Sequence, residues 1–78
     1  MASAKELIEF VAKSIVDDPS QVRVSEIERG STLTVELRVG QEDMGRVIGR
    51  SGRTANAMRA LLRILAAKQE KRIDLEIV

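Results

Sequence analysis

The chain has 78 residues, of which 44% are hydrophobic and 32% are charged, and its formal net charge is +1. These values are typical of a single globular domain, which we expect to span residues 1–78. With no cysteine and no histidine, the chain can form neither a disulfide nor a thiolate metal site, and it lacks the commonest general base. No segment resembles a membrane span or a signal peptide. We therefore expect a cytoplasmic protein without metal or cofactor.

The first predicted element is a helix from Ser3 to about Val16. Apolar residues recur there every three or four positions, and Ser3 followed by Glu6 has the pattern of a capping box. Asp17-Asp18-Pro19 ends the helix, because the residue before a proline avoids helical geometry. Phe10, the only aromatic residue, lies off the apolar stripe. We expect it to pack at the edge of a sheet, and the alternative is a contact surface.

Two strands joined by a tight turn come next. From Gln21 to about Arg29 the apolar alternation slips between Val24 and Ile27, which favours a bulge or a frayed edge strand. From Thr32 to Val39 the alternation is regular and predicts a strand with one solvated face. Gly30-Ser31 between the two strands predicts a hairpin.

A short helix and a long helix follow the hairpin. Glu42 and Asp43 place negative charge at the start of the short helix, which carries Met44, Val47 and Ile48. The long helix runs from about Arg53 to Lys68. Its expected core stripe consists of Ala55, Met58, Leu61, Leu62, Leu65 and Ala66.

The long helix is apolar around most of its circumference, and its polar stripe is limited to Asn56, Arg59 and Arg63. A helix with this pattern is covered from more than one side. We expect the first helix to supply the second cover, and the alternative is a partner chain.

Residues 72–77 alternate apolar and polar and predict a third strand at the end of the chain. The element order is therefore helix, strand, strand, helix, helix, strand. Because two helices connect the second and third strands, these strands should be parallel. The sequence predicts an α+β fold in which three helices cover one face of a three-stranded mixed sheet.

Positive charge is concentrated in one part of the chain. Between Met44 and Gln69 there are six basic residues and no acidic residue, whereas the flanking segments are acidic. This distribution focuses positive potential on one face of a folded domain. For Arg59 and Arg63, contact with a nucleic-acid backbone and simple solvation remain open, and for Arg46 we expect solvation.

The short and long helices are joined by Gly49-Arg50-Ser51-Gly52, a Gly-x-x-Gly turn. At a helix start such a turn can present free N–H groups to an anion. The nucleotide-hydrolase loop and the dinucleotide fingerprint both require other glycine spacings. No nucleophile has a histidine base beside it, so the sequence predicts no catalytic residues and no enzyme.

The segment Gly45–Thr54, within this order of elements, resembles the KH domain in its type II arrangement. The whole chain is similar to the small stand-alone bacterial KH proteins of the KhpA (YlqC) family. The resemblance implies binding of single-stranded RNA, with the loop clamping the backbone and an apolar floor beneath the bases. Many relatives carry lysine where this chain has Arg50. The arginine retains the positive charge of the lysine, but its contact geometry with a phosphate differs. The RNA-binding residues implied are Val47, Ile48, Gly49, Arg50, Ser51, Gly52, Arg53 and Arg59.

The resemblance also implies a place for the rest of the site and a set of partners. The opposite wall of the groove would lie near Ile27 and the loop Arg29-Gly30-Ser31. Proteins of this family are associated with homodimers, with a larger KH partner called KhpB, Jag or EloR, and with cell elongation and division. The expected role is a post-transcriptional regulator or RNA chaperone. The alternative is a protein-interaction module that dimerises through the apolar long helix, with RNA contact secondary.

Overall fold

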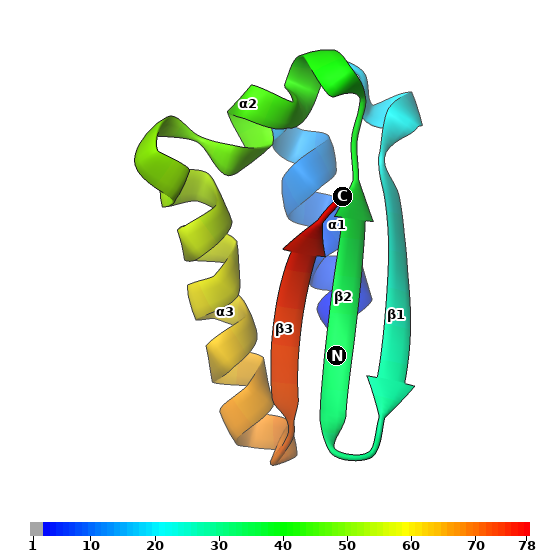
Figure 1. The fold of residues 1–78 in the computed structure, drawn as a ribbon, viewed down its shortest axis with the longest axis vertical. Coiled ribbons are helices and arrows are strands. Elements are labelled where there is room, and N and C mark those ends of the chain that lie inside the picture. Colours follow the sequence, from blue (N-terminus) through cyan, green and yellow to red (C-terminus); the bar gives the residue numbers. More distant parts are fainter. Residues whose placement is uncertain (1–2) are drawn as a thin grey trace.

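The computed structural model describes residues 3–78 and contains the six predicted elements in the predicted order (Figure 1). Three short 3₁₀ turns, at Pro19–Gln21, Gln41–Asp43 and Arg50–Gly52, lie between them. The elements are α1 (Ala4–Ile15), β1 (Arg23–Arg29), β2 (Thr32–Arg38), α2 (Met44–Ile48), α3 (Arg53–Gln69) and β3 (Arg72–Ile77).

The predicted capping box begins α1. The Ser3 hydroxyl accepts a hydrogen bond from the Glu6 amide at 3.1 Å, and the Glu6 carboxylate accepts one from the Ser3 amide at 3.1 Å. These two bonds satisfy N–H groups that have no partner inside the helix. The chain then turns through Pro19–Gln21, capped by Asp18, so β1 begins two residues after the predicted start at Gln21.

The sheet has the strand order β1-β2-β3, with β1 antiparallel to β2 and β2 parallel to β3. This arrangement confirms the predicted mixed sheet. The register between β1 and β2 is continuous from Arg23 to Arg29, so the expected bulge is absent and β1 is a regular edge strand. The alternation slips because Ile27 lies opposite Thr34 on the open face, while Glu26 takes the position on the face that carries Val24.

The core lies between the sheet and the three helices, which cover one face (Figure 1). In Figure 1, α1 passes behind the sheet and α3 lies beside β3. The fold is the expected α+β arrangement of a type II KH domain. The largest fully buried side chains are Ile8, Leu37, Met58, Leu62, Val35 and Val47.

Two expectations about apolar side chains are wrong. Phe10 is 72% exposed and does not pack at the sheet edge. The buried face of α1 is centred on Ile8, and a residue two positions further on lies about 200° around the helix. Leu61 was expected in the core and is 40% exposed, because α3 turns Ala55, Met58 and Leu62 toward the sheet. Within residues 3–78, no helix is long and apolar enough to span a bilayer.

Candidate nucleic-acid interface

The Gly-x-x-Gly turn between α2 and α3 has an unusual backbone. The φ angles of Gly49, Ser51 and Gly52 are 79°, 56° and 76°. Glycine adopts such angles freely, so the two glycines are placed where the turn requires them. Ser51 is a non-glycine residue in the left-handed region, which the sequence pattern did not predict. Residues of this kind cluster at functional sites.

Gly49 is required by the packing of the loop itself. A Cβ at this position would lie 2.4 Å from Oγ1 and 2.8 Å from the backbone nitrogen of Thr54. The Gly49 amide donates to the Gly45 carbonyl at 2.8 Å and ends α2. Any other residue at this position would have to push the loop away from the start of α3.

Gly52 has a different environment. A Cβ there would meet only Nδ2 of Asn56, at 3.7 Å, and would otherwise point into open space. Gly52 is the N-cap of α3, and no side chain caps this helix start. The first N–H groups of a helix have no acceptor within it, and the helix dipole adds positive charge there. The loop therefore offers an accessible, uncapped helix start to an anion.

Two arginines flank this helix start without being used by the fold. Arg50 and Arg53 are exposed, and neither forms an ion pair within residues 3–78. Arg46 differs: its side chain is solvated, as expected, but its Nη2 also lies 3.2 Å from Oδ2 of Asp17. Arg50 and Arg53 are the cations of the loop that remain available.

Arg59 extends the basic surface from the loop toward the sheet. The residue is half-buried, and its Nη2 donates to the carbonyl of Leu75 in β3 at 3.4 Å. Its Nη1 lies 3.5 Å from Oδ1 of Asn56. Arg63 is exposed one helical turn further along the same side of α3. Asn56, Arg59 and Arg63 form a polar stripe along α3, from which Arg59 reaches β3.

The comparisons with known proteins identify the family. Residues 5–77 match the family model described as the KhpA/KhpB KH domain. The chain belongs to this family. It is 46% identical to RNA-binding protein KhpA of Clostridium acetobutylicum, over 95% of this chain and 99% of that protein. It is 49% identical to RNA-binding protein KhpA of Borreliella burgdorferi, over 94% of this chain and 89% of that protein.

The fold of this KH domain is also found in a larger protein. A crystal structure of Aquifex aeolicus Era bound to GDP and aluminium fluoride superposes with a TM-score of 0.65 at 17% sequence identity. The match covers 95% of this chain and 29% of the Era chain. At this identity the likeness concerns the fold alone.

The structure corrects the predicted apolar floor of this KH domain. Val47 has no exposed surface and packs in the core. Its side chain therefore attaches α2 to the core and cannot contact a base. Ile48 is 39% exposed at the end of α2, next to Gly49. Ile48 is therefore the apolar side chain of this pair that a bound strand can reach.

The expected opposite wall of the groove is also wrong. In Figure 1, β3 lies beside α3, whereas β1 forms the opposite edge of the sheet. The β1–β2 turn at Gly30 lies at the end of the sheet away from the Gly-x-x-Gly loop. The strand that lies beside α3 and accepts the Arg59 hydrogen bond is β3, whereas Ile27 lies on the other edge strand, β1.

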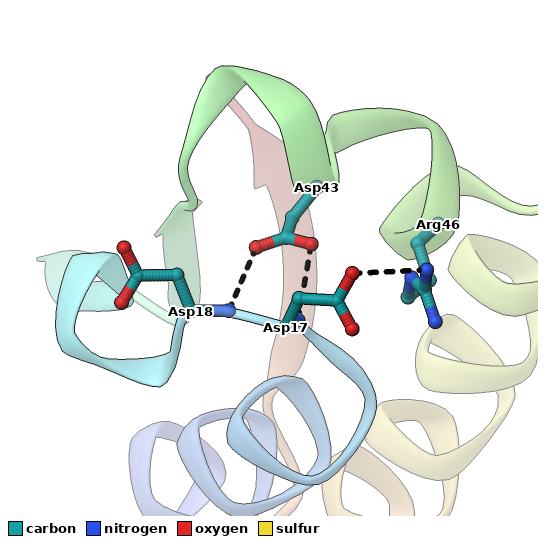
Figure 2. A network of polar contacts seen from close by, with 4 residues as sticks. All are labelled: Asp17, Asp18, Asp43 and Arg46. Atoms are coloured by element: carbon teal, nitrogen blue, oxygen red, sulfur yellow. Dashed lines mark hydrogen bonds and ion pairs between the residues drawn. The ribbon is translucent and has the colours of Figure 1, made fainter.

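Asp43 is a residue at this end of the KH domain whose importance the sequence did not reveal. The sequence pattern predicts for it only a contribution of negative charge at a helix start. The structure buries it to 4% exposure, and both carboxylate oxygens accept backbone hydrogen bonds (Figure 2). The partner amides belong to Asp17 and Asp18, more than 20 positions earlier in the chain. No local pattern in the sequence indicates such a long-range contact.

Proposed function

We propose that this KH domain, spanning residues 1–78, binds single-stranded RNA and holds the phosphate backbone at the loop from Gly49 to Arg53. Two independent lines support the proposal. Relatives that are nearly half identical over almost their whole length are named RNA-binding proteins. The loop itself offers the N–H groups of an uncapped helix start with two arginines beside it.

The observation that carries the proposal is the open space above Gly52. Because a Cβ there would meet nothing closer than 3.7 Å, a phosphate can approach the backbone of the loop and the first N–H groups of α3. Arg50 and Arg53 can add charge-assisted hydrogen bonds, each of which contributes about 1.5–3 kcal/mol. The Ser51 hydroxyl is small and exposed and can donate one more bond.

The bases of such a strand would lie over Ile48 and along the side of α3 that carries Arg59. The only aromatic residue of the chain, Phe10, is on α1 and belongs to no part of this surface. Stacking on aromatic side chains supplies about 1–3 kcal/mol per base in other single-strand binders. Without it, we expect modest affinity and little base selectivity, with strong dependence on salt.

The test exchanges the charge of the loop. In the double variant Arg50→Asp/Ser51→Asp, two negative charges replace a cation and a hydroxyl at the helix start. We expect affinity for a fluorescently labelled single-stranded RNA, measured by anisotropy, to fall at least about tenfold. Unchanged affinity would contradict the proposal.

A matched control has the same charge change at the opposite end of the sheet. Arg29→Asp/Ser31→Asp alters two exposed residues of the same types in and next to the β1–β2 turn. We expect this variant to bind RNA more weakly only by the general effect of net charge, within about threefold of the unmodified protein. Equal losses in both variants would show that binding follows net charge and not the loop.

We propose that the cellular role follows from RNA binding by a small domain. A single KH domain grips about four nucleotides, so a post-transcriptional regulator or RNA chaperone of this size gains affinity by acting with a partner. The partner we propose is a larger KH protein of the KhpB type, in the cytoplasm, with effects on cell elongation and division.

A second candidate function, dimerisation, is favoured by the outer face of α3. Apolar side chains recur along this face at helical spacing and are exposed, with Leu61 at 40% and Ile64 at 60%. An exposed apolar stripe of this kind marks an interaction surface. The stripe consists of Ala57, Ala60, Leu61, Ile64 and Ala67. We propose that it pairs with a second copy of the chain or with a larger KH protein.

Sedimentation equilibrium tests this second candidate. Ile64→Glu places a charge in the middle of the stripe, and we expect it to convert a dimer into a monomer with little loss of stability, because the residue is largely exposed. Phe10→Glu is the control, since it removes an even more exposed apolar side chain from α1. A monomeric unmodified protein, or dimers in both variants, would contradict dimerisation through α3.

A further inference from the structure

Asp43 connects two parts of the fold that are far apart in the sequence. It is the one charged residue that is buried among residues 3–78. Its Oδ1 accepts from the amide of Asp17 at 3.0 Å, and its Oδ2 accepts from the amide of Asp18 at 3.1 Å (Figure 2). These amides follow the end of α1, whereas Asp43 directly precedes α2. One carboxylate thus joins the exit of α1 to the entry of α2.

The short α2 needs such an attachment. It has five residues, and isolated helices of that length do not persist in water. No side chain caps its start, which continues directly from the 3₁₀ turn at Gln41–Asp43. Asp43 holds it to the domain through its hydrogen bonds, Val47, one turn further on, is fully buried in the core, and the partly buried Met44 packs against the core.

The Gly-x-x-Gly loop begins where α2 ends. Gly49 directly follows Ile48, and its amide is bonded to the carbonyl of Gly45 inside α2. Any tilt or fraying of α2 therefore moves the loop relative to α3 and β3. The pair between Arg46 and Asp17 lies next to the Asp43 contact but is largely exposed on both sides (Figure 2). Such exposed pairs add little rigidity.

We propose that Asp43 is a positioning residue for the RNA-binding loop: its bonds to the Asp17 and Asp18 amides fix α2 and thereby keep the loop in its binding conformation. The inference rests on the proposed RNA binding for its functional consequence. When the two bonds are lost, α2 samples other positions and the fraction of molecules with a competent loop falls. The apparent dissociation constant rises by the inverse of that fraction.

Asp43→Asn is the main test variant, because the amide is nearly the same size but can accept from only one of the two N–H groups. Asp43→Ala removes both bonds and is the stronger change, and the Asn variant serves if the Ala variant does not fold. At a temperature where all proteins are folded, we expect Asp43→Asn to bind a short single-stranded RNA about three- to tenfold more weakly.

The control separates positioning from general stability. Leu33→Val shortens a buried side chain in β2, near the β1–β2 turn and away from α2. It should lower the thermal midpoint without changing RNA affinity. A loss of RNA affinity in Leu33→Val equal to that in Asp43→Asn, at equal thermal midpoints, would overturn the proposal.

Nuclear magnetic resonance tests the positioning role of Asp43 in the absence of RNA. In Asp43→Asn we expect faster hydrogen exchange at the amides of Asp17 and Asp18 and increased backbone mobility at residues 49–53, with neither change in Leu33→Val. Faster exchange at the two amides with an unchanged loop and unchanged RNA affinity would overturn the proposal. Absence of RNA binding by the unmodified protein would refute the proposed function instead, while the mobility of the loop would still test the role of Asp43.

Discussion

The two ends of α2 differ in how far the fold itself uses their polar groups. At the N-terminal end, the Asp43 carboxylate is buried and both of its oxygens are occupied by backbone amides. At the C-terminal end, the start of α3 is uncapped, and Arg50 and Arg53 form no ion pair within residues 3–78. The first end holds the helix in place, and the second end leaves donors and charge for a ligand.

The difference extends to the backbone. At the C-terminal end, Gly49, Ser51 and Gly52 all have positive φ angles. A non-glycine residue in the left-handed conformation, such as Ser51, costs about 1–3 kcal/mol of folding free energy. Strain of this kind persists only where the surroundings hold it. The close packing of Gly49 on Thr54 and the anchoring of α2 supply that support.

Gly49→Ala should have the largest effect on stability. The new Cβ would overlap both the side chain and the backbone of Thr54, and its φ of 79° is unfavourable for alanine. We expect a loss of about 3 kcal/mol, which in a domain of this size lowers the thermal midpoint by more than about 10 °C. Thermal unfolding followed by circular dichroism measures it, and a change below about 1 kcal/mol would show that the loop can move away from α3.

Gly52→Ala should affect binding more than stability. The added methyl meets open space, so the cost to the fold is the left-handed φ alone, about 1 kcal/mol. The same methyl occupies the approach of a phosphate, and we expect RNA affinity to fall about tenfold. Gly52→Asn is the control for strain, because asparagine tolerates this conformation. Compared with Gly52→Ala, this variant should regain stability but not RNA affinity. Full recovery of RNA affinity would contradict the proposed approach of a phosphate over Gly52.

Asp17→Asn should have a small effect, in contrast to the expected effect of Asp43→Asn. It weakens the pair with Arg46, in which the two side chains are 56% and 77% exposed, but it leaves the amide that Asp43 binds. We expect a change in stability below about 0.5 kcal/mol and an RNA affinity within about twofold. A loss as large as that of Asp43→Asn would show that the exposed pair also anchors α2.

The smallest expected effect is a pH dependence of stability that arises from Asp18, which caps the 3₁₀ turn at Pro19–Gln21. Hydrogen bonds from Ser20 and Gln21 hold the pKa of Asp18 below its ordinary value of 3.8. Because the pKa is lower in the folded state than in the unfolded state, the ionised carboxylate stabilises the protein at pH values above the unfolded pKa. This contribution is lost as the pH falls through the folded pKa. Asp18→Asn should therefore show a shallower loss of thermal midpoint below about pH 4. Parallel pH profiles for both proteins would contradict this role.

Local patterns in the sequence predicted most of the fold. The capping box of α1, the alternation in β2 and the two helices between β2 and β3 act over a few residues, and the structure contains each of them. Errors arose where a distant part of the chain decides the outcome. Leu61 resembles Leu62 in the sequence, but only the packing of α1 and the sheet against α3 determines which of the two is buried.

The position of the candidate site was predictable in the same way. Glycine spacing and charge predicted the loop between α2 and α3 and its exposed arginines, because both are properties of adjacent residues. The partners of Asp43 and Arg59 could not be predicted, since each bonds to backbone atoms of a different element. The expected groove wall near Ile27 failed because the sequence does not show which edge of the sheet lies beside α3, and in the structure this edge is β3 rather than β1.

The measurement that tests the central claim most directly is a nuclear magnetic resonance titration of the unmodified protein with single-stranded RNA. We predict that the largest shifts in amide resonances occur at residues 48–53 and along the side of α3 that carries Arg59. The amides of Asp17 and Asp18, which remain bound to Asp43, should shift little. Largest shifts at the β1–β2 turn or on the open face of the sheet, with none at the loop, would contradict the account.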